Sequence, residues 1–130
     1  MTKRFYLATR KDRSDVAATI VDGLKRDGWE RTYTWTAQDG GTREQYAAIA
    51  LAELAGVAEA DVLVVLLPGG YGTHVEIGAA LAAGKRVVLH APDQQTLETP
   101  YPCVFHYHPN VSILIGKSLD IDALTNAMKH

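Results

Sequence analysis

The sequence predicts an α/β fold, with a Rossmann-like open, mainly parallel sheet of about five strands flanked by helices. Short apolar runs alternate along the chain with longer segments of helical periodicity, which is the pattern of repeated strand–helix units. The run Val62–Leu67 is apolar throughout, as expected of a central strand that is buried on both faces. In such open sheets, ligands bind beyond the carboxyl ends of the strands.

The first half of the chain contains two strands and two helices. The predicted elements are a strand at Arg4–Ala8, a helix at Ser14–Asp27, a strand at Glu30–Thr34, a polar loop at Ala37–Gly41 and a helix at Thr42–Ala55. The first helix has an apolar residue at every fourth position, and Gly28 follows it as a helix-ending residue. Thr42 and Gln45 have the spacing of a capping box, so we expect the second helix to begin there.

The second half of the chain continues the alternation. Its predicted elements are the strand Val62–Leu67, a turn at Pro68–Gly72, a helix at Thr73–Ala83, a strand at Arg86–His90, a polar loop at Ala91–Pro102, a strand at Val111–Ile115 and a helix at Ser118–Lys129. Gly84 follows the third helix, and Ser118 is the expected cap of the last one.

Composition limits the function classes. The length of 130 residues fits one domain, residues 1–130, and the net charge of −2 lacks the basic footprint of a nucleic-acid-binding protein. The chain has no apolar run long enough to span a membrane and no secretory signal at its start. Its single cysteine, Cys103, excludes an internal disulfide and suits a reducing cytoplasm. We therefore expect a cytoplasmic protein without nucleic-acid or membrane partners.

Asp61–Lys85 is the segment most informative about chemistry, because a buried strand meets a glycine-rich turn that opens a helix. Glycines allow positive φ angles and close approach of a ligand to the backbone, and the first turn of a helix offers N–H groups to an anion. Gly69, Gly70, Gly72 and Thr73 are therefore predicted to bind a phosphate or a sugar hydroxyl, although many turns of this kind are only turns.

Glu76 is the only charged residue of the helix Thr73–Ala83, which is apolar all round and is therefore predicted to be buried. A buried carboxylate is costly unless it has a partner or a role. An acidic residue near a helix start also favours the helix dipole, but that explanation suits a surface position better. The pattern therefore indicates a catalytic carboxylate at Glu76.

Other polar residues give weaker indications. Glu53 lies on or beside the apolar stripe of its helix, with a solvated rim position as the even alternative. Arg10, just after the first strand, suits a phosphate, although a solvated arginine explains the charged run at Arg10–Arg13 equally well. His74 is two residues from Glu76 and faces another side of the helix, which favours a structural or rim role.

Neither a metal nor a cofactor is expected. His106 and His108 can share one face of an extended segment, but no carboxylate or cysteine spacing completes a zinc set. No full G-x-G-x-x-G motif follows the first strand, so dinucleotide binding is not indicated.

Several motifs resemble the nucleoside 2-deoxyribosyltransferase superfamily, which includes the 2′-deoxynucleoside 5′-phosphate N-hydrolases. They are Phe5–Ala8 with its tyrosine, Glu53 eight positions before Asp61, and above all Gly72–Ala80 followed by Gly84-Lys85. The resemblance implies that Glu76 is the nucleophile that attacks the sugar C1′, that Tyr6 hydrogen-bonds it, and that the protein is a homo-oligomer. Glu53 stands where the family usually has aspartate. Gly70 replaces an aspartate that the transferases carry.

A second resemblance covers the single motif Pro68–Glu76, which is similar to the PGGxGTxxE motif of the cytokinin-activating nucleotide phosphoribohydrolases. The Arg-Lys pair of that family is absent, and Ala52-Glu53 occupies the region. Both families cleave N-glycosidic bonds. The expected function is thus cleavage of a (deoxy)nucleoside or its 5′-monophosphate, by hydrolysis or by transfer to another base. The alternative is a nucleotide-binding sensor or accessory module without catalysis.

Overall fold

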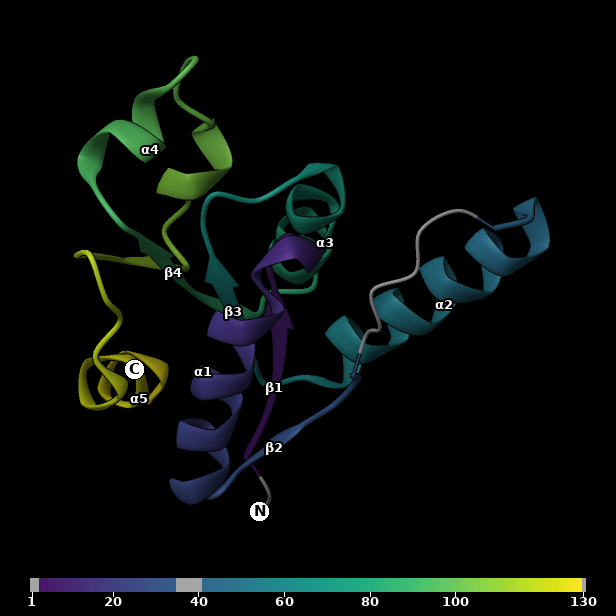
Figure 1. The fold of residues 1–130 in the computed structure, drawn as a ribbon, viewed down its shortest axis with the longest axis horizontal. Helices are drawn as coiled ribbons and strands as arrows, with labels where there is room; N and C mark the ends of the chain where they lie inside the picture. The colour runs from purple at the N-terminus through teal and green to yellow at the C-terminus, as the bar shows by residue number, and fades with distance from the viewer. Residues whose placement is uncertain (1–2, 35–40, 130) are drawn as a thin grey trace.

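The computed structural model describes residues 3–34 and 41–129, which form a parallel five-stranded sheet with helices on both faces (Figure 1). The strands are β1 (Lys3–Ala8), β2 (Trp29–Arg31), β3 (Val62–Leu66), β4 (Arg86–Ala91) and β5 (Val111–Ile115). Their order in the sheet is β2-β1-β3-β4-β5, and all four neighbouring pairs are parallel. The predicted α/β class is confirmed. The strand order reverses between β1 and β3, which is where open α/β sheets bind ligands.

Five α-helices and two short 3₁₀ helices complete the described chain. They are η1 (Lys11–Arg13), α1 (Ser14–Arg26), α2 (Arg43–Glu59), α3 (Tyr71–Ala82), α4 (Gln94–Glu98), η2 (Val104–Tyr107) and α5 (Ile121–Met128). Among the described residues, none of these helices is long and apolar enough for a membrane span.

Successive strand residues enter two separate cores, because side chains along a strand alternate between its faces. Phe5 and Leu7 of β1 pack in the core that α1 and α5 cover. Tyr6 and Ala8 pack in the other core, which α2 and α3 cover. The alternation therefore points Tyr6 towards the same layer as α3, the helix that carries Glu76.

Local signals located several helix ends correctly. The Thr42 side chain accepts from the N–H of Gln45 at 3.1 Å, and the Gln45 side chain accepts from the N–H of Thr42 at 2.7 Å, which confirms the capping box. Gly28 and Gly84 have φ values of +90° and +74° directly after α1 and α3. Glycine adopts this left-handed conformation without the steric cost that other residues meet, so both helices end where glycine was expected to end them.

Other element boundaries were predicted wrongly. β2 ends at Arg31 rather than Thr34, α2 continues to Glu59 rather than ending near Ala55, and α3 begins at Tyr71 rather than Thr73. The last helix is capped by Asp120, whose side chain accepts from the N–H groups of Asp122 and Ala123, and not by Ser118. The expected loop Ala91–Pro102 contains α4, capped by Asp93 through the N–H of Thr96 at 2.8 Å. Apart from Gly41, the expected loop Ala37–Gly41 lies outside the described residues.

Two helices are more exposed than their apolar sequences predicted. α2 extends away from the rest of the ribbon (Figure 1), and its Tyr46, Leu51 and Leu54 are exposed, Leu51 by 72%. The prediction that the third helix is buried all round is wrong, because Tyr71 and Val75 face outward. We call these five residues of α2 and α3 the outer apolar face.

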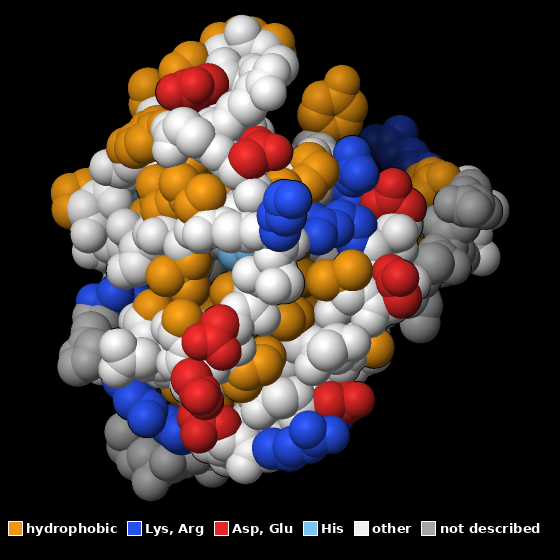
Figure 2. All heavy atoms as spheres, turned by 60° about the vertical axis from the view of Figure 1, so that its left-hand side comes forward, with side chains coloured by type: hydrophobic (Ala, Val, Ile, Leu, Met, Phe, Trp, Pro, Cys, Tyr) orange, Lys and Arg blue, Asp and Glu red, His pale blue; other side chains and the backbone are white. Residues whose placement is uncertain are grey.

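A second exposed apolar region belongs to the segment between β4 and β5. In the view of Figure 2, hydrophobic side chains gather over the upper part of the molecular surface. The segment contributes exposed Tyr101, Val104, Phe105 and Tyr107. Single exposed apolar residues are ordinary, whereas groups of this kind are typical of surfaces that contact another molecule.

Candidate active site

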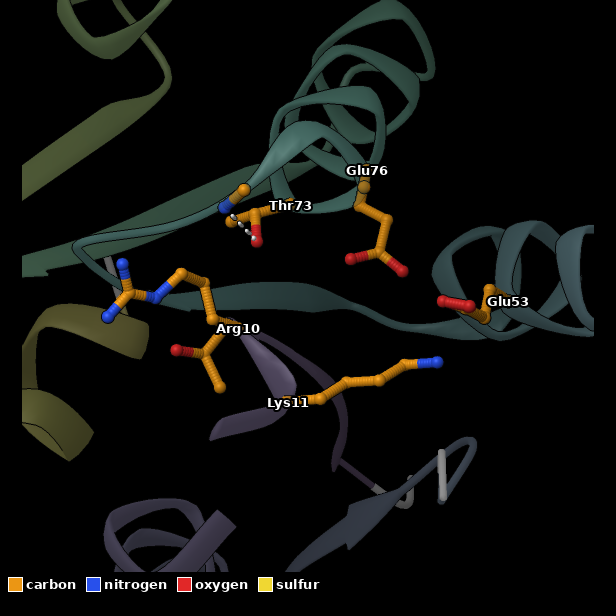
Figure 3. A pocket seen from close by; sticks show the side chains of 8 residues that line it. Arg10, Lys11, Glu53, Thr73 and Glu76 are labelled. Atoms are coloured by element: carbon orange, nitrogen blue, oxygen red, sulfur yellow. Dashed lines mark hydrogen bonds between the residues drawn. The ribbon is translucent and has the colours of Figure 1, made fainter. Parts of the chain in front are cut away.

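A cavity of about 250 Å³ lies beyond the carboxyl ends of β1 and β3, at the point where the strand order reverses. Three elements line it (Figure 3). The lining residues are Thr9, Arg10 and Lys11 after β1, Glu53 of α2, and Gly70, Gly72, Thr73 and Glu76 at the start of α3. The structure thus brings together most of the residues that the sequence singled out. The exceptions are Gly69 and Tyr6, of which Tyr6 contacts Glu76 through a hydrogen bond.

The glycine turn does not use the backbone conformation that was expected of it. None of its glycines has a positive φ. Gly69 is required for space instead, since an added Cβ would lie 2.6 Å from the Cγ2 atom of buried Thr73. Gly72 has open space where a Cβ would point. The turn therefore uses the small size of its glycines rather than an unusual backbone geometry.

Thr73 organises the first turn of α3. Its hydroxyl accepts a hydrogen bond from the N–H of Gly70 at 3.1 Å, and its side chain is buried. The N–H groups of Tyr71, Gly72 and Thr73 open the helix and have no carbonyl one turn earlier within it. These donors, with the positive end of the helix dipole, suit an anionic group in the cavity.

Glu76 is only 7% exposed, and Tyr6 donates its hydroxyl hydrogen bond to the Oε2 atom of Glu76. Tyr6 is fully buried in β1, 70 residues earlier in the chain. Tyr33 stacks beside it, with ring centroids 6.5 Å apart and nearly parallel planes. Gly56 of α2 permits this arrangement, because an added Cβ would lie 2.7 Å from Tyr33 Cβ and 3.0 Å from Tyr6 Cδ2. Sequence reasoning overlooked Gly56, for which only the break in an alanine-rich helix offered a signal.

The surroundings of Glu76 strongly perturb its ionisation. Burial raises the pKa of Glu76 to about 8 from an ordinary 4.5, the Tyr6 hydrogen bond opposes that rise, and Glu53 adds to it. Burial, the charge of Glu76 and the hydrogen bond to Glu76 together raise the pKa of Tyr6 well above its ordinary value, so Tyr6 remains a hydrogen-bond donor. Carboxyl groups perturbed in this way are typical of functional sites.

Basic and acidic side chains lie on different sides of the cavity, except that Lys11 points towards the acidic side (Figure 3). Figure 3 shows the Lys11 side chain directed towards the side where Glu53 and Glu76 lie, and Arg10 directed to the other side, near the β3–α3 turn. The charge of Lys11 lowers the pKa of Glu76, against the larger effect of burial. Arg10 also contacts Asp12 at 3.2 Å on the exposed rim. Sequence reasoning overlooked Lys11 because the run Arg10–Arg13 has the composition of a solvated surface.

His74 is not among the cavity-lining residues. Its Nδ1 lies 2.9 Å from the carbonyl oxygen of Gly70, and its Nε2 lies 2.9 Å from Nε2 of His106. His108, the near neighbour of His106 in the sequence, accepts at Nδ1 from the N–H of Asn110 at 3.0 Å. Asp61, whose carboxylate accepts from the N–H of Arg4 at 2.9 Å, is structural: it joins the starts of β1 and β3.

Comparisons with known proteins show the family and the fold of this chain. The model of a family described as nucleoside 2-deoxyribosyltransferase matches residues 5–126. The structure of the CMP N-glycosidase BcmB of Clostridium botulinum is 22% identical, covers 98% of each chain and has a TM-score of 0.65. A conserved protein from Enterococcus faecalis V583 is 18% identical, covers 99% of this chain and 98% of its own, and has a TM-score of 0.71. Both structures share the fold. None of the curated proteins matches.

Proposed function

Because the chain belongs to the nucleoside 2-deoxyribosyltransferase family, we propose that it cleaves the N-glycosidic bond of a nucleoside or nucleoside 5′-monophosphate, with Glu76 as nucleophile. The observation that carries this proposal is the buried Glu76 carboxylate, which accepts a hydrogen bond from Tyr6 in the wall of the cavity. A carboxylate without a role at this position would be a cost to stability that the fold has no reason to retain.

The reaction begins with attack of the ionised Glu76 carboxylate on the sugar C1′. The C1′–N bond breaks, its electron pair leaves with the base, and a glycosyl ester forms through an oxocarbenium-like state, as in retaining glycosidases. Water then releases the sugar, or a second base takes it and forms a new nucleoside. Division of one difficult step into two easier ones is the advantage of covalent catalysis.

The residues around Glu76 have distinct parts in this scheme. The Tyr6 hydroxyl holds the carboxylate in place and stabilises its ionised form. Glu53, which faces the same cavity, is the candidate for protonating the departing base, because the transferases' aspartate is replaced here by Gly70. The N–H groups at the start of α3 and the side chain of Arg10 bind the 5′-phosphate or 5′-hydroxyl.

Arg10 provides a test of phosphate binding. Arg10→Ala is expected to lower kcat/KM for a 5′-monophosphate by about 10- to 100-fold, the effect of losing one hydrogen bond to a charged group. The corresponding nucleoside, which lacks the phosphate, should be affected much less. Arg26→Ala, which removes an exposed arginine of α1, is the matched control. Equal losses for nucleotide and nucleoside would contradict a phosphate-binding role for Arg10.

The outer apolar face supports the proposal that the protein is a homo-oligomer. α2 and α3 are in contact, so their exposed residues Tyr46, Leu51, Leu54, Tyr71 and Val75 belong to adjoining helices. Burial of such a surface against a second copy stabilises association, and closed symmetric dimers are the commonest result.

Leu51 tests this association. Leu51→Glu is expected to convert the oligomer into a monomer of 14.1 kDa in light scattering, because it places a charge on the apolar contact. Leu51→Met, which keeps the position apolar, should leave the oligomer unchanged. A wild-type protein that is itself a 14.1 kDa monomer would contradict the proposal.

The function itself is tested with a panel of nucleosides and 5′-monophosphates in the ribo and deoxy forms, with and without an added free base, analysed by chromatography. CMP belongs in the panel because a structure of similar fold is a CMP N-glycosidase. Release of free base that requires the phosphate indicates a nucleotide hydrolase, and formation of a new nucleoside indicates a transferase. Binding of a nucleotide that remains intact would support the sensor or accessory module, which the replacements at Gly70 and Glu53 favour.

A further inference from the structure

A cluster of side chains of the types that ligate metals lies outside the cavity. His74 of α3 meets Cys103 and His106, which come from the segment between β4 and β5. One nitrogen of each histidine and the cysteine sulfur all lie within 4.8 Å of one another. Cys103 caps η2, and His106 is three residues further on, a spacing that places both side chains on one side of a 3₁₀ helix.

The rings of His74 and His106 already face each other within this cluster. His74 Nδ1 donates to the carbonyl oxygen of Gly70 at 2.9 Å, so its Nε2 carries the lone pair and faces His106 Nε2 at 2.9 Å. Metal-binding histidines in proteins commonly donate their second nitrogen to a carbonyl in this way, which fixes the tautomer and the ring direction. His106 is 5% exposed, and its Nδ1 has no hydrogen-bond partner among the described residues.

We propose that His74, Cys103 and His106 bind Zn²⁺, with water in the fourth position. Two imidazoles and a thiolate form a donor set that zinc prefers, while calcium and magnesium prefer oxygen ligands. In a tetrahedral zinc site two nitrogen ligands lie about 3.3 Å apart, so the two rings need only a small separation from their present contact. The thiol of Cys103 releases its proton to solvent as the ion binds.

The proposed ion would connect two parts of the fold that the sheet does not join directly. It would tie η2 to the first turn of α3, and the carbonyl that orients His74 belongs to Gly70, which lines the cavity. The ion is therefore expected to restrain the β3–α3 turn, which lines the candidate active site. The alternative is a hydrogen bond from His106 Nε2 to His74 Nε2 without any ion, and the two arrangements respond differently to added metal.

The test uses the untagged full chain, reduced and freed of metal, titrated with Zn²⁺ alone by calorimetry and with Co²⁺ by absorption spectroscopy. We expect a single ion per chain, a thiolate-to-cobalt charge-transfer band and the visible bands of tetrahedral cobalt. Cys103→Ser should abolish the charge-transfer band. Cys103→Ser and His106→Gln should each weaken Zn²⁺ binding by at least about 10- to 100-fold, the loss that removal of even an outer-shell partner causes. His108→Gln, a neighbouring histidine outside the cluster, should behave like the wild type.

Thermal unfolding gives a second readout. Zn²⁺ should raise the melting temperature of the wild type and of His108→Gln, but not that of Cys103→Ser, because an ion that binds only the folded protein stabilises it. A wild type that gives no thiolate-to-cobalt band, or that binds Zn²⁺ no more tightly than His106→Gln, would overturn the proposal in favour of the hydrogen-bonded pair. The spectrum of the wild type decides this even if a variant folds poorly.

Discussion

Glu76→Gln is expected to lower kcat/KM for free-base release by about 10³-fold or more, a loss of at least about 4 kcal/mol of transition-state stabilisation. Glutamine has nearly the shape of glutamate but cannot form the glycosyl ester and carries no charge to stabilise an oxocarbenium-like state. The measurement is base release under saturating and limiting substrate. Retention of more than about a tenth of the activity would remove Glu76 from the role of nucleophile.

Stability measurements separate lost chemistry from lost folding in this variant. The folded protein binds a proton at Glu76 more tightly than the unfolded chain does, because burial raises the pKa from 4.5 to about 8. The stability that this site contributes is complete below pH 4.5 and decreases as the pH rises to about 8. Glu76→Gln avoids the cost of ionising a buried carboxyl, so at pH 8 it should be more stable than the wild type by about 4 kcal/mol, and by much less at low pH. A variant that is inactive yet more stable is the outcome expected of a catalytic carboxylate.

The pH dependence of the reaction should follow the ionisation of Glu76. In the wild type kcat/KM is expected to rise with pH and to reach half of its maximum near pH 8, since the proposed attacking form is the carboxylate of the free enzyme. Tyr6→Phe removes the hydrogen bond that favours this form, so the rising limb moves to higher pH. The expected shift is about one to two pH units, with a 10- to 100-fold loss of kcat/KM at pH 7.

Glu53→Gln is the matched variant for this profile. Removal of the Glu53 charge lowers the pKa of Glu76, because that charge disfavours ionisation of the neighbouring carboxyl. The rising limb should therefore move to lower pH, opposite to the effect of Tyr6→Phe. If Glu53 also protonates the leaving base, the plateau falls while the limb still shifts. If the rising limb of kcat/KM lies at the same pH in both variants as in the wild type, the pH dependence reports the ionisation of a group other than Glu76.

Short-range patterns in the sequence were enough to predict the α/β class. The apolar run at Val62–Leu67 and the capping box at Thr42 depend on consecutive residues, so they can be recognised without knowledge of any partner. Glu76 was recognisable for the same reason, as the only charge in an apolar helix beside a glycine-rich turn. These signals also located the candidate site at the carboxyl ends of the strands.

Contacts between distant segments required the tertiary structure. The strand order places β1 beside β3, and only this neighbourhood brings Lys11 and Arg10 to the same cavity as Glu76. Gly69 is needed because of the side chain of Thr73, and not because of its own backbone angles. The outward position of Val75 depends on how α3 lies on the sheet, which the uniform apolar composition of that helix leaves open.

The His74–Cys103–His106 cluster is the clearest example of a contact between distant segments that local sequence patterns leave open. Sequence spacing indicated no metal set around His106 and its near neighbour His108, whereas the fold joins His106 to His74, 32 residues earlier. The class of fold, several helix ends and the prominence of Glu76 were predictable because each depends on residues adjacent in the chain. Which side chains meet across the sheet depends on strand order and helix orientation, which arise from packing of the whole chain and leave no local pattern.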